Sequence, residues 1–464
     1  MFQRIKHVHF VGIGGSGMSG IAEVLRTLGY RVTGSDLKST PVTEALVRAG
    51  AEVFLSHDAA NVAGAHVVVR SSAVKSDNPE IAEAAARNIP VISRAEMLAE
   101  LARLKYTVAV AGTHGKTTTT SMVATILDHA GMDPTFVIGG RVNTVGRNAR
   151  LGTGDFIVLE ADESDGSFLM LSPTIAVITN VEADHLDHYS GIDEIEDAFV
   201  AFANKVPFYG AVVVPSETMA APRIARRIKR TVITFGTAPD ARVRIERCVF
   251  DGLGSRFELH YNGGSQVACR LQVPGDHNVL NAAAAFAAAY EMGVEPEVIA
   301  AGLAAFAGVE RRFQIKVSDP FTVIDDYAHH PTEIRATIAA ARRAGFKRIL
   351  AAFQPHRYTR THHLLDDFVS AFDEADSVMI ADIYPAGEMP IDGVTSRALV
   401  ERIRLAGKTP VEHVAQVEGM EARFLDRARA GDLVLIMGAG NITALADRVA
   451  AAAGRIGHGK VNHG

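Results

Sequence analysis

Short apolar runs alternate with segments of helical periodicity along the whole chain. Runs at residues 7–13, 31–35 and 66–69 read as buried strands, and the stretches between the early runs carry apolar residues at helical spacing. Such alternation predicts parallel sheets covered by helices. The pattern returns in the middle and at the end of the chain. We therefore predict an α/β protein of three domains, each built on a mostly parallel sheet.

The first apolar run leads into a glycine-rich segment. Gly12, Gly14 and Gly17 fit the pattern G-x-G-x-x-G, and a helix to about Leu28 follows. The next strand ends at Asp36, which completes the order of a dinucleotide-binding unit. This order predicts a site for a pyrophosphate. A nicotinamide-dependent dehydrogenase would show the same pattern, so the loop alone does not identify its ligand.

A second glycine loop follows the apolar run at residues 108–111 and spans Gly112-Thr113-His114-Gly115-Lys116-Thr117-Thr118. A loop of this build turns backbone N–H groups inward, and the helix that follows adds the positive end of its dipole. Lys116 would reach terminal phosphates, and the Thr117 hydroxyl would hold Mg²⁺. The usual first glycine of the motif is Val110 here, so the match is incomplete. The alternative is a plain strand, turn and helix, but Lys-Thr after a glycine turn is a specific combination.

Acidic and polar residues follow the next two predicted strands. The run at residues 156–160 ends in Glu160, and the run at 175–178 leads to His185. In open parallel sheets ligands bind at the carboxyl ends of the strands, so both clusters should reach the second glycine loop. Mg²⁺ that bridges ATP phosphates needs such ligands, and we predict Thr117, Glu160 and His185 for it. Taken singly, Asp165, Asp187 and His188 are better explained as solvated loop residues.

Alternating apolar residues between 242 and 273, with glycine turns, predict an antiparallel hairpin segment attached to the central sheet. An alanine-rich helix follows. Asn278 and Asn281 can each offer a donor and an acceptor to an adenine edge. The structural alternative for this polar cluster is that Asp276 or His277 caps the helix.

Polar side chains also follow two strands of the last predicted domain. The strand at residues 321–324 is followed by an Asp pair and by His329, and the strand at 348–353 is followed by Arg357 and Arg360. An arginine fork at a strand end suits a carboxylate or a phosphate. For each arginine alone, a surface ion pair is the alternative.

Length and composition agree with three globular domains. The 464 residues suggest about three domains. With the glycine loops and strand ends above, we predict a Rossmann-like domain at 1–104, a central domain at 105–318 with a mostly parallel P-loop ATPase-like sheet and the antiparallel hairpin segment, and a second Rossmann-like domain at 319–464. A net charge of −6 without a basic run argues against nucleic-acid and membrane partners. Cys248 and Cys269 alone do not form a disulfide framework, and no uninterrupted apolar run is long enough to span a bilayer. A reducing cytoplasm is therefore the expected location.

Several stretches between about residues 7 and 441 together resemble the Mur ligase family. They begin at Gly12 (Gly-Ile-Gly-Gly-Ser-Gly-Met-Ser-Gly), Gly112 (Gly-Thr-His-Gly-Lys-Thr), Glu160 (Glu-Ala-Asp-Glu-Ser-Asp), His277 (His-Asn-Val-Leu-Asn), Arg311 (Arg-Arg-Phe), Asp325 (Asp-Asp-Tyr-Ala-His-His-Pro-Thr-Glu) and Gln354 (Gln-Pro-His-Arg-Tyr-Thr-Arg-Thr). The glycine missing at Val110 also fits, because the ligase loop is shorter than a full P-loop motif.

The resemblance implies an ADP-forming amide ligase of peptidoglycan precursor synthesis. In that reaction ATP phosphorylates the lactyl carboxylate of UDP-N-acetylmuramate, and the amine of L-alanine attacks the acyl phosphate. The implied cofactors are ATP and Mg²⁺. The implied catalytic residues are Lys116, Glu160, His185, His329, Arg357 and Arg360. The implied ATP-binding residues are Gly112, Thr113, His114, Gly115, Lys116, Thr117, Thr118, His277, Asn278, Asn281 and Arg312. The implied residues for the UDP-sugar are Gly12, Gly14, Gly15, Ser16, Gly17, Asp36, His57 and Ser71.

Three other readings stay open. A sister ligase of the same family attaches a recycled tripeptide to UDP-N-acetylmuramate. An NAD-dependent oxidoreductase would explain the first glycine loop but leave the Lys116 loop without a role. A non-catalytic nucleotide switch would explain Lys116 but not the polar strand ends of the last domain. The oligomeric state is open, and a homodimer is one of the assemblies considered.

Overall fold

The structure is a computed structural model that describes residues 5–71, 73–143, 147–184, 188–217 and 220–461. Internal contacts divide the chain into two compact units. The first unit comprises Met1–Glu246, Leu259–Cys269 and Leu280–Phe306, and the second comprises Arg247–Glu258, Arg270–Val279 and Ala307–Gly464. The chain forms three β-sheets, and each is described separately below.

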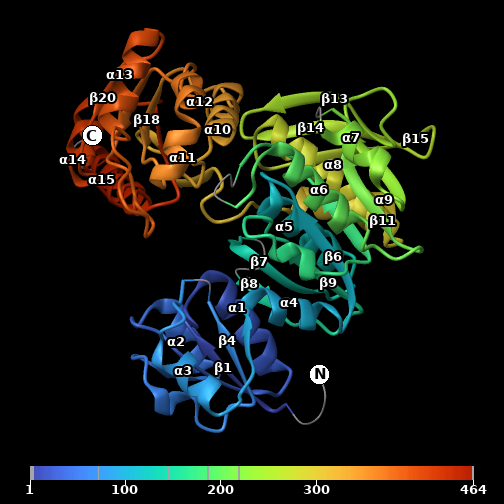
Figure 1. Cartoon of the computed structure of the whole chain (residues 1–464). Coiled ribbons are helices and arrows are strands. Elements are labelled where there is room, and N and C mark those ends of the chain that lie inside the picture. The colour runs from blue at the N-terminus through green and yellow to red at the C-terminus, as the bar shows by residue number, and fades with distance from the viewer. Residues whose placement is uncertain (1–4, 72, 144–146, 185–187, 218–219, 462–464) are drawn as a thin grey trace. The chain divides into compact units, whose positions relative to one another are not determined.

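The first sheet is the blue part of the chain in Figure 1 and has the strand order β3-β2-β1-β4-β5. Its strands are β1 (His7–Val11), β2 (Arg31–Ser35), β3 (Glu52–Phe54), β4 (Val67–Arg70) and β5 (Val91–Ser93). All neighbours pair in parallel. The helices are α1 (Ser16–Thr27), α2 (Pro41–Arg48), the short 3-10 helix η1 (Ala59–Val62), α3 (Pro79–Ala86) and α4 (Arg94–Ala102). β1 is central and buried along its whole length, as the apolar run predicted.

The second sheet has ten strands in the order β15-β14-β13-β12-β11-β10-β6-β9-β7-β8. Its strands are β6 (Tyr106–Ala111), β7 (Thr135–Val142), β8 (Arg147–Arg150), β9 (Phe156–Glu160), β10 (Ile175–Ile178), β11 (Ala211–Pro215), β12 (Thr231–Gly236), β13 (Val243–Asp251), β14 (Gly254–Tyr261) and β15 (Ser265–Leu271). β6 lies between β9 and β10 and is parallel to both. The ends of β9 and β10 therefore flank the second glycine loop, as predicted.

The last three strands of this sheet form the expected hairpin segment. Loops of only a few residues join β13 to β14 and β14 to β15, and such short loops connect antiparallel neighbours. The helices that accompany the sheet are α5 (Lys116–His129), the 3-10 helix η2 (Ser167–Met170), α6 (Ile192–Ala203), α7 (Ala220–Arg227), α8 (Asp276–Glu291) and α9 (Pro296–Ala305). Residues 117–127 of α5 are all buried, so the helix after the glycine loop is a core element.

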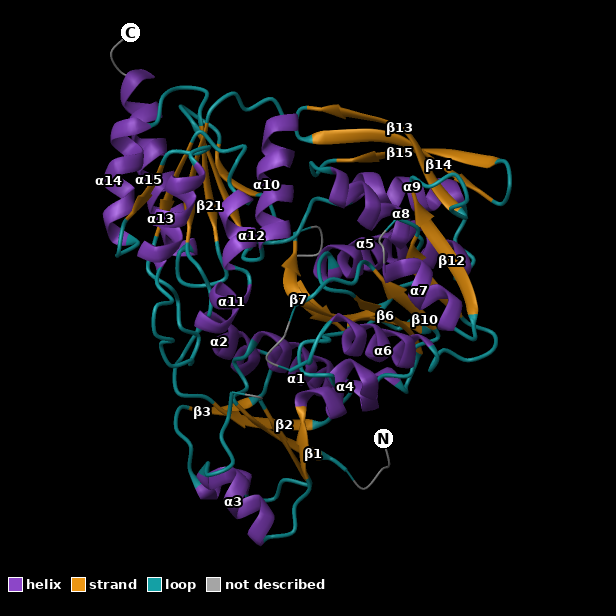
Figure 2. Cartoon of the chain, turned by 45° about the horizontal axis from the view of Figure 1, so that its top comes forward, coloured by secondary structure: helices purple, strands orange, loops and turns teal. Residues whose placement is uncertain are grey.

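The third sheet has the order β16-β17-β21-β18-β19-β20. Its strands are β16 (Gln314–Val317), β17 (Thr322–Asp326), β18 (Ile349–Phe353), β19 (Ser377–Ile380), β20 (Val411–His413) and β21 (Leu433–Met437). β16 is antiparallel to β17, and the other neighbours are parallel. The helices are α10 (Pro331–Arg343), α11 (Tyr358–His363), α12 (Leu365–Ser370), α13 (Ser396–Ala406), α14 (Glu418–Arg427) and α15 (Thr443–Val461). Side chains of α10, α12 and α13 form one core with the sheet, and those of α14 and α15 form a second core. Figure 2 shows these helices around the sheet.

The expected α/β class with three sheets is confirmed, and two local expectations are wrong. Asp325 and Asp326 were expected after a strand, but they are its last residues and are buried. The strand extends because Asp326 accepts backbone N–H groups and Asp325 pairs with Arg311 and Thr443, so both carboxylates tolerate burial. Asp276 is already the first residue of α8, so neither it nor His277 precedes the helix as a cap. Among the described residues, no helix has the length and apolar character needed to cross a membrane.

Candidate active site

The second glycine loop connects β6 to α5 through two residues of unusual backbone conformation. Gly112 has φ of 132° and Gly115 has φ of 82°. A Cβ atom at Gly115 would collide with the Asn281 side chain, and one at Gly112 would collide with Thr179. Both positions therefore require glycine for space as well as for conformation. Gly115 precedes the first turn of α5 without a side-chain cap, which leaves the first N–H groups of the helix directed at a potential anion.

Lys116 lies at the first position of α5 and is held on several sides. Its Nζ donates to the carbonyl oxygens of Gly112 at 2.7 Å and Thr113 at 3.2 Å, and to Glu163 Oε1 at 2.8 Å. Burial works to lower the pKa of Lys116, but the negative charges of Glu163 and the neighbouring acids outweigh it and raise the pKa. The ammonium is therefore charged and positioned at the mouth of the loop, as phosphate binding requires.

Thr117 and Glu160 meet as the sequence predicted for a cation site. Thr117 Oγ1 donates to Glu160 Oε1 at 2.9 Å, and Glu160 Oε2 accepts the Gly139 N–H at 2.7 Å. Hydroxyl and carboxylate oxygens are the donors that Mg²⁺ prefers, so this pair fits that ion. The third predicted ligand, His185, lies outside the described residues.

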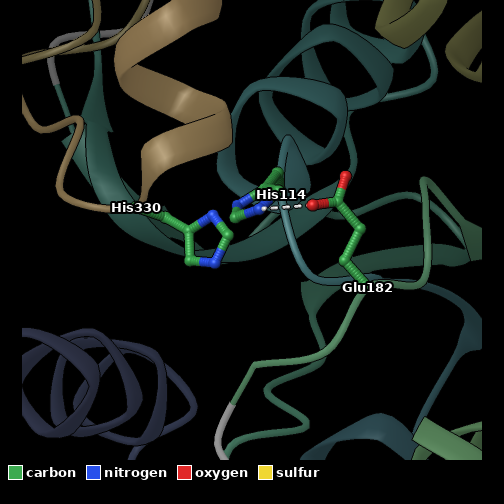
Figure 3. Close-up of side chains that lie close together, drawn as sticks. All are labelled: His114, Glu182 and His330. Atoms are coloured by element: carbon green, nitrogen blue, oxygen red, sulfur yellow. Dashed lines mark ion pairs between the residues drawn. The ribbon is translucent and has the colours of Figure 1, made fainter. Parts of the chain in front are cut away.

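Residues after β10 fix the shape of the same loop. The His114 N–H donates to Asn180 Oδ1 at 2.8 Å, and Asn180 Nδ2 donates back to the His114 carbonyl at 2.9 Å. Thr113 Oγ1 accepts the Glu182 N–H at 2.9 Å. The His114 ring faces the Glu182 carboxylate at 3.6 Å, as the dashed line in Figure 3 marks. The loop that carries Lys116 is thus held in place by the neighbouring strand end.

The remaining residues predicted for ATP occupy different surroundings. Thr118 is buried in the first turn of α5. Asn278 Nδ2 donates to the Pro274 carbonyl at 2.6 Å. Burial lowers the pKa of His277 to about 4, and the nearby Arg312 charge acts in the same direction. The Arg312 guanidinium lies 5.2 Å from the centre of the Tyr327 ring and 3.5 Å from Glu333.

The first glycine loop is closed by an acid and carries no cation of its own. Gly12 has φ of 82°, and the Gly15 N–H donates to the Gly12 carbonyl at 3.2 Å. Asp36 Oδ2 accepts the Gly14 N–H at 2.9 Å, so this residue, which was predicted for the UDP-sugar, contacts the loop itself. Ser16 begins α1, and a Cβ atom at Gly17 would meet the Arg94 side chain at 3.0 Å.

His57 and Ser71, both predicted to face the UDP-sugar, lie at the carboxyl edge of the first sheet. The Ser71 Cβ lies within 3.1 Å of the position that a Cβ of Gly12 would take. The His57 ring contacts Ser35 at 3.0 Å and the fully buried Glu80 at 2.8 Å. Glu80 also accepts from Ser35 at 2.7 Å. The buried carboxylate thus connects His57 to the strand that supports the loop.

His329, in the loop between β17 and α10, is held by two acceptors. Its Nδ1 lies 3.0 Å from the Tyr327 carbonyl and 3.1 Å from Glu333 Oε2. Burial lowers the pKa of His329; Glu333 opposes this shift, and the Arg360 charge adds to it. The His329 ring lies 6.1 Å from the His356 ring. A neutral imidazole is thus held beside a positive charge.

Arg357 and Arg360 flank this pair of histidines. Burial lowers the pKa of His356 to about 3, and the charges of Arg360 and Arg357 act in the same direction. Arg357 precedes α11 with φ of 71° and ψ of 140°, a region that costs a residue other than glycine roughly 1–3 kcal/mol. The corner formed by His329, His356, Arg357 and Arg360 is therefore positively charged and suited to an anionic group.

Three sequence models of related domains match the chain. They are the Mur ligase family catalytic domain over residues 7–106, the Mur ligase middle domain over 110–289 and the Mur ligase glutamate ligase domain over 311–440. Together these matches cover most of the chain. The chain belongs to the Mur ligase family. As a Mur ligase it is an ATP-dependent ligase.

Relatives of this Mur ligase match it over nearly its whole length. A UDP-N-acetylmuramate–L-alanine ligase of Solibacter usitatus is 53% identical over 451 residues, which span 97% of this chain and 96% of that protein. A protein of the same name from Geotalea daltonii is 54% identical over 443 residues, spanning 95% and 97%.

Two solved structures resemble this Mur ligase over their full length. The UDP-N-acetylmuramate–alanine ligase of Thermotoga maritima matches with a TM-score of 0.82 and 31% identity, covering 97% of this chain and 99% of that one. A murein peptide ligase of Psychrobacter arcticus matches with a TM-score of 0.71 and 27% identity over the same shares. The fold predicted from the glycine loops and strand ends is therefore that of the family.

Sequence reasoning missed several residues that the structure of this Mur ligase brings to the candidate sites. Glu163 pairs with Lys116, Asn180 holds the loop at His114, and Arg94 lies against Gly17. His356 was read as part of a polar strand end without a role of its own. Glu163, Asn180 and His356 each follow a predicted strand, and Arg94 begins a helix. These positions were the signal in the sequence that could have identified them.

Proposed function

We propose that this Mur ligase joins L-alanine to the lactyl carboxylate of UDP-N-acetylmuramate with conversion of ATP to ADP and phosphate. The observation that carries the proposal is the group of relatives named for this reaction, which are more than half identical over at least 95% of the chain. The Lys116 loop supports the ATP-dependent step, and the corner at Arg357 supports handling of an anionic acyl group and an amino acid.

The proposed chemistry has two steps because a carboxylate is a poor electrophile. In the first, a carboxylate oxygen forms a bond to the γ-phosphorus of ATP while the bond to the β-phosphate oxygen breaks, which yields ADP and an acyl phosphate. In the second, the amine of alanine forms the C–N bond at the carbonyl carbon, loses a proton, and inorganic phosphate leaves. Positioning and charge neutralisation supply most of the catalysis of phosphoryl transfer.

The residues divide between these steps. The charged Lys116 would neutralise the transferring phosphoryl group, since its Nζ is fixed by Gly112 and Glu163. Mg²⁺, when bound by Thr117, Glu160 and His185, would neutralise further phosphate charge. Arg357 and Arg360 would hold the acyl phosphate and the carboxylate of alanine, because a guanidinium grips two oxygens at once. His329, neutral in its buried setting, would line the same corner.

Nucleotide assignments follow the two glycine loops. The loop at Gly12–Gly17, with Asp36, His57 and Ser71 beside it, is proposed for the UDP-sugar. ATP is proposed to use the residues of the second loop together with His277, Asn278, Asn281 and Arg312. These roles correspond to proposed domains at residues 1–104, 105–318 and 319–464. The cytoplasm, where UDP-sugar and ATP are available, is the proposed location, and a homodimer is the assembly to test.

An ADP-release assay tests the proposal. We expect release only when UDP-N-acetylmuramate, an amino acid and Mg²⁺ are all present, with L-alanine preferred to the tripeptide L-alanyl-γ-D-glutamyl-diaminopimelate. Preference for the tripeptide would favour the sister reaction. Reduction of NAD without ADP release would favour an oxidoreductase, and ATP binding without turnover would favour a switch.

A further inference from the structure

A loop after β19 turns back on itself within a few residues. It runs from Tyr384 to Glu388, and we refer to it as the Tyr384–Glu388 loop. Ala386 and Gly387 have φ of 49° and 88°, and the Glu388 N–H donates to the Pro385 carbonyl at 2.9 Å. Two consecutive positive φ angles close a tight turn. The turn brings both Tyr384 and Glu388 against the segment that follows β18.

The backbone and ring of Tyr384 contact the segment that follows β18. The Tyr384 N–H donates to the Pro355 carbonyl at 2.8 Å, and the Arg357 N–H donates to the Tyr384 carbonyl at 2.9 Å. The rings of Tyr384 and His356 stack with centroids 5.6 Å apart and planes 11° apart. One end of the loop therefore holds His356 and the backbone of Arg357.

The Glu388 carboxylate holds the other end of the same segment. Its Oε1 accepts from Thr359 Oγ1 at 2.7 Å, and its Oε2 accepts the Thr359 N–H at 3.1 Å. The Arg357 Nε lies 4.0 Å from Oε1. The Glu388 side chain is only 21% exposed, so water replaces these partners poorly. Glu388 thus supplies the N-terminal cap that α11 lacks from its own sequence.

The segment needs external support because its own conformation is unfavourable. Arg357 has φ of 71°, makes no side-chain cap hydrogen bond and precedes α11, a helix of only 6 residues. Strained backbone persists only where the surroundings determine it, and so short a helix does not stabilise itself. The contacts from the Tyr384–Glu388 loop therefore help to keep His356 and Arg357 in their observed places.

We propose that Glu388 is a positioning residue for the amino-acid step, which acts through Thr359 and the Arg357 backbone to aim the Arg357 guanidinium and the His356 ring. This inference rests on the proposed function of the corner formed by His329, His356, Arg357 and Arg360. Glu388 has no assigned role in substrate contact. Removal of the Glu388 carboxylate should therefore change the KM for L-alanine and the local backbone dynamics, and should change the KM for ATP little.

The test compares Glu388→Ala with Glu388→Gln. Glutamine keeps an oxygen for the Thr359 N–H and an amide N–H₂ that can donate to Thr359 Oγ1, so it preserves the geometry without the charge. We expect Glu388→Ala to raise the KM for L-alanine at least about 10-fold, because an Arg357 guanidinium that is no longer aimed holds the carboxylate of alanine less well. We expect Glu388→Gln to stay within about threefold of the parent, and the KM for ATP to change less than about twofold in both variants.

Asp373→Ala is the matched control. It removes one carboxylate from the same sheet domain, where Asp373 pairs with Lys408 at 2.7 Å in an exposed ion pair. Such a pair contributes little to stability, and no change in any KM is expected. An unchanged KM for L-alanine in Glu388→Ala overturns the proposal. An equal rise in the KM values for all three substrates overturns it too, because that result indicates general destabilisation.

Hydrogen–deuterium exchange separates this proposal from the proposed function. In Glu388→Ala the amides of residues 357–363 should exchange faster than in the parent and in Glu388→Gln, whatever the substrates are. Unchanged exchange there would contradict the role of Glu388. If the parent protein releases no ADP with alanine and UDP-N-acetylmuramate, the proposed function fails on its own, while the exchange result still decides whether Glu388 holds the corner.

Discussion

The two glycine loops share one local design and differ in what surrounds it. Each follows a buried parallel strand, begins with a glycine at positive φ and leads into a helix without a side-chain cap. The first loop is closed by the Asp36 carboxylate, whereas the second contains Lys116 and meets Glu160 through Thr117. A strand–loop–helix unit therefore provides an anion site, and the residues around it decide whether the anion is only bound or also reacts.

The side chains that hold the two loops in place also carry opposite charges. Ser35 accepts the N–H groups of Gly12 and Ile13, and its hydroxyl donates to the buried Glu80. The second loop is held by the partly buried ammonium of Lys116, which donates to the carbonyls of Gly112 and Thr113. Burial works to raise the pKa of Glu80, but hydrogen bonds from His9, Ser35, Asn61 and His57 hold it below the usual value. One loop thus rests on a buried anion and the other on a partly buried cation.

The largest loss of activity is expected on removal of Lys116, the charged residue of the second loop. Lys116→Ala should lower ADP formation by about 1000-fold, because a fixed charge at the transferring phosphoryl group is lost. Steady-state ADP release at saturating substrates measures it. Lys105→Ala is the control, because Lys105 donates to the carbonyls of Gly152 and Gly154 and is not part of the loop. Near-parent turnover of a folded Lys116→Ala protein would remove Lys116 from the mechanism and the main difference between the loops.

A somewhat smaller effect is expected at the cation site. Glu160→Ala should lower ADP formation by about 100-fold, because the carboxylate that accompanies Thr117 is lost. The loss should be partly recovered at raised Mg²⁺ concentration, since weaker metal binding is its cause. A Mg²⁺ titration of the parent and the variant measures this. A Mg²⁺ dependence identical in both proteins would indicate that Glu160 does not bind the metal.

A substitution in the first loop should weaken binding of UDP-N-acetylmuramate only. Gly14→Val should weaken UDP-N-acetylmuramate binding at least about 10-fold, which corresponds to about 1.4 kcal/mol. A Cβ atom at Gly14 would lie 2.8 Å from Asp36 Oδ2 and 3.0 Å from Thr43, so the loop must shift away from a pyrophosphate. Calorimetric titration of both nucleotides measures it, with ATP affinity unchanged. Gly264→Val is the control, because a Cβ atom there would have no heavy atom within 4 Å. Loss of ATP affinity instead would mean that the two loops are assigned the wrong way round.

The smallest effect concerns the buried anion behind the first loop. The folded pKa of Glu80 is lowered, so the unfolded chain binds more protons as pH falls below about 4.5, and the stability that Glu80 contributes is lost in that range. Glu80→Gln removes this titration. Its melting temperature should therefore fall about 3 °C less than that of the parent between pH 7 and pH 4.

Scanning calorimetry of both proteins at several pH values checks this expectation. Glu83→Gln on the same helix serves as the control, because Glu83 makes a partly exposed ion pair with Arg87. Its pH profile should follow the parent profile. Parallel profiles for Glu80→Gln and the parent would show that the buried carboxylate does not couple to folding, and the contrast in sign between the two loops would lose its energetic basis.

Local patterns in the sequence were sufficient for several central strands, the two glycine loops and the helices that follow them. Apolar runs predicted β1, β2, β9 and β10 within a few residues, because a central strand of a parallel sheet must be apolar on both faces. The loop at Gly112 was predictable because its two glycines and Lys116 lie close together in one short stretch of the chain. The placement of Glu160 beside Thr117 followed from the rule that strand ends share one edge.

Only the tertiary structure decided which distant side chains complete each site. Lys116 and Glu163 lie 47 positions apart, and their contact depends on β6 pairing with β9. His356 and Glu388 gain their places from a turn whose partner segment lies 29 positions away at Thr359. Periodicity reports whether a residue is buried, but it does not report the partner, because pairing depends on strand order and on turns that close far from the site. For this reason the chain alone predicted the glycine loops, while the acids and rings that hold Lys116 and Arg357 in place were visible only after folding.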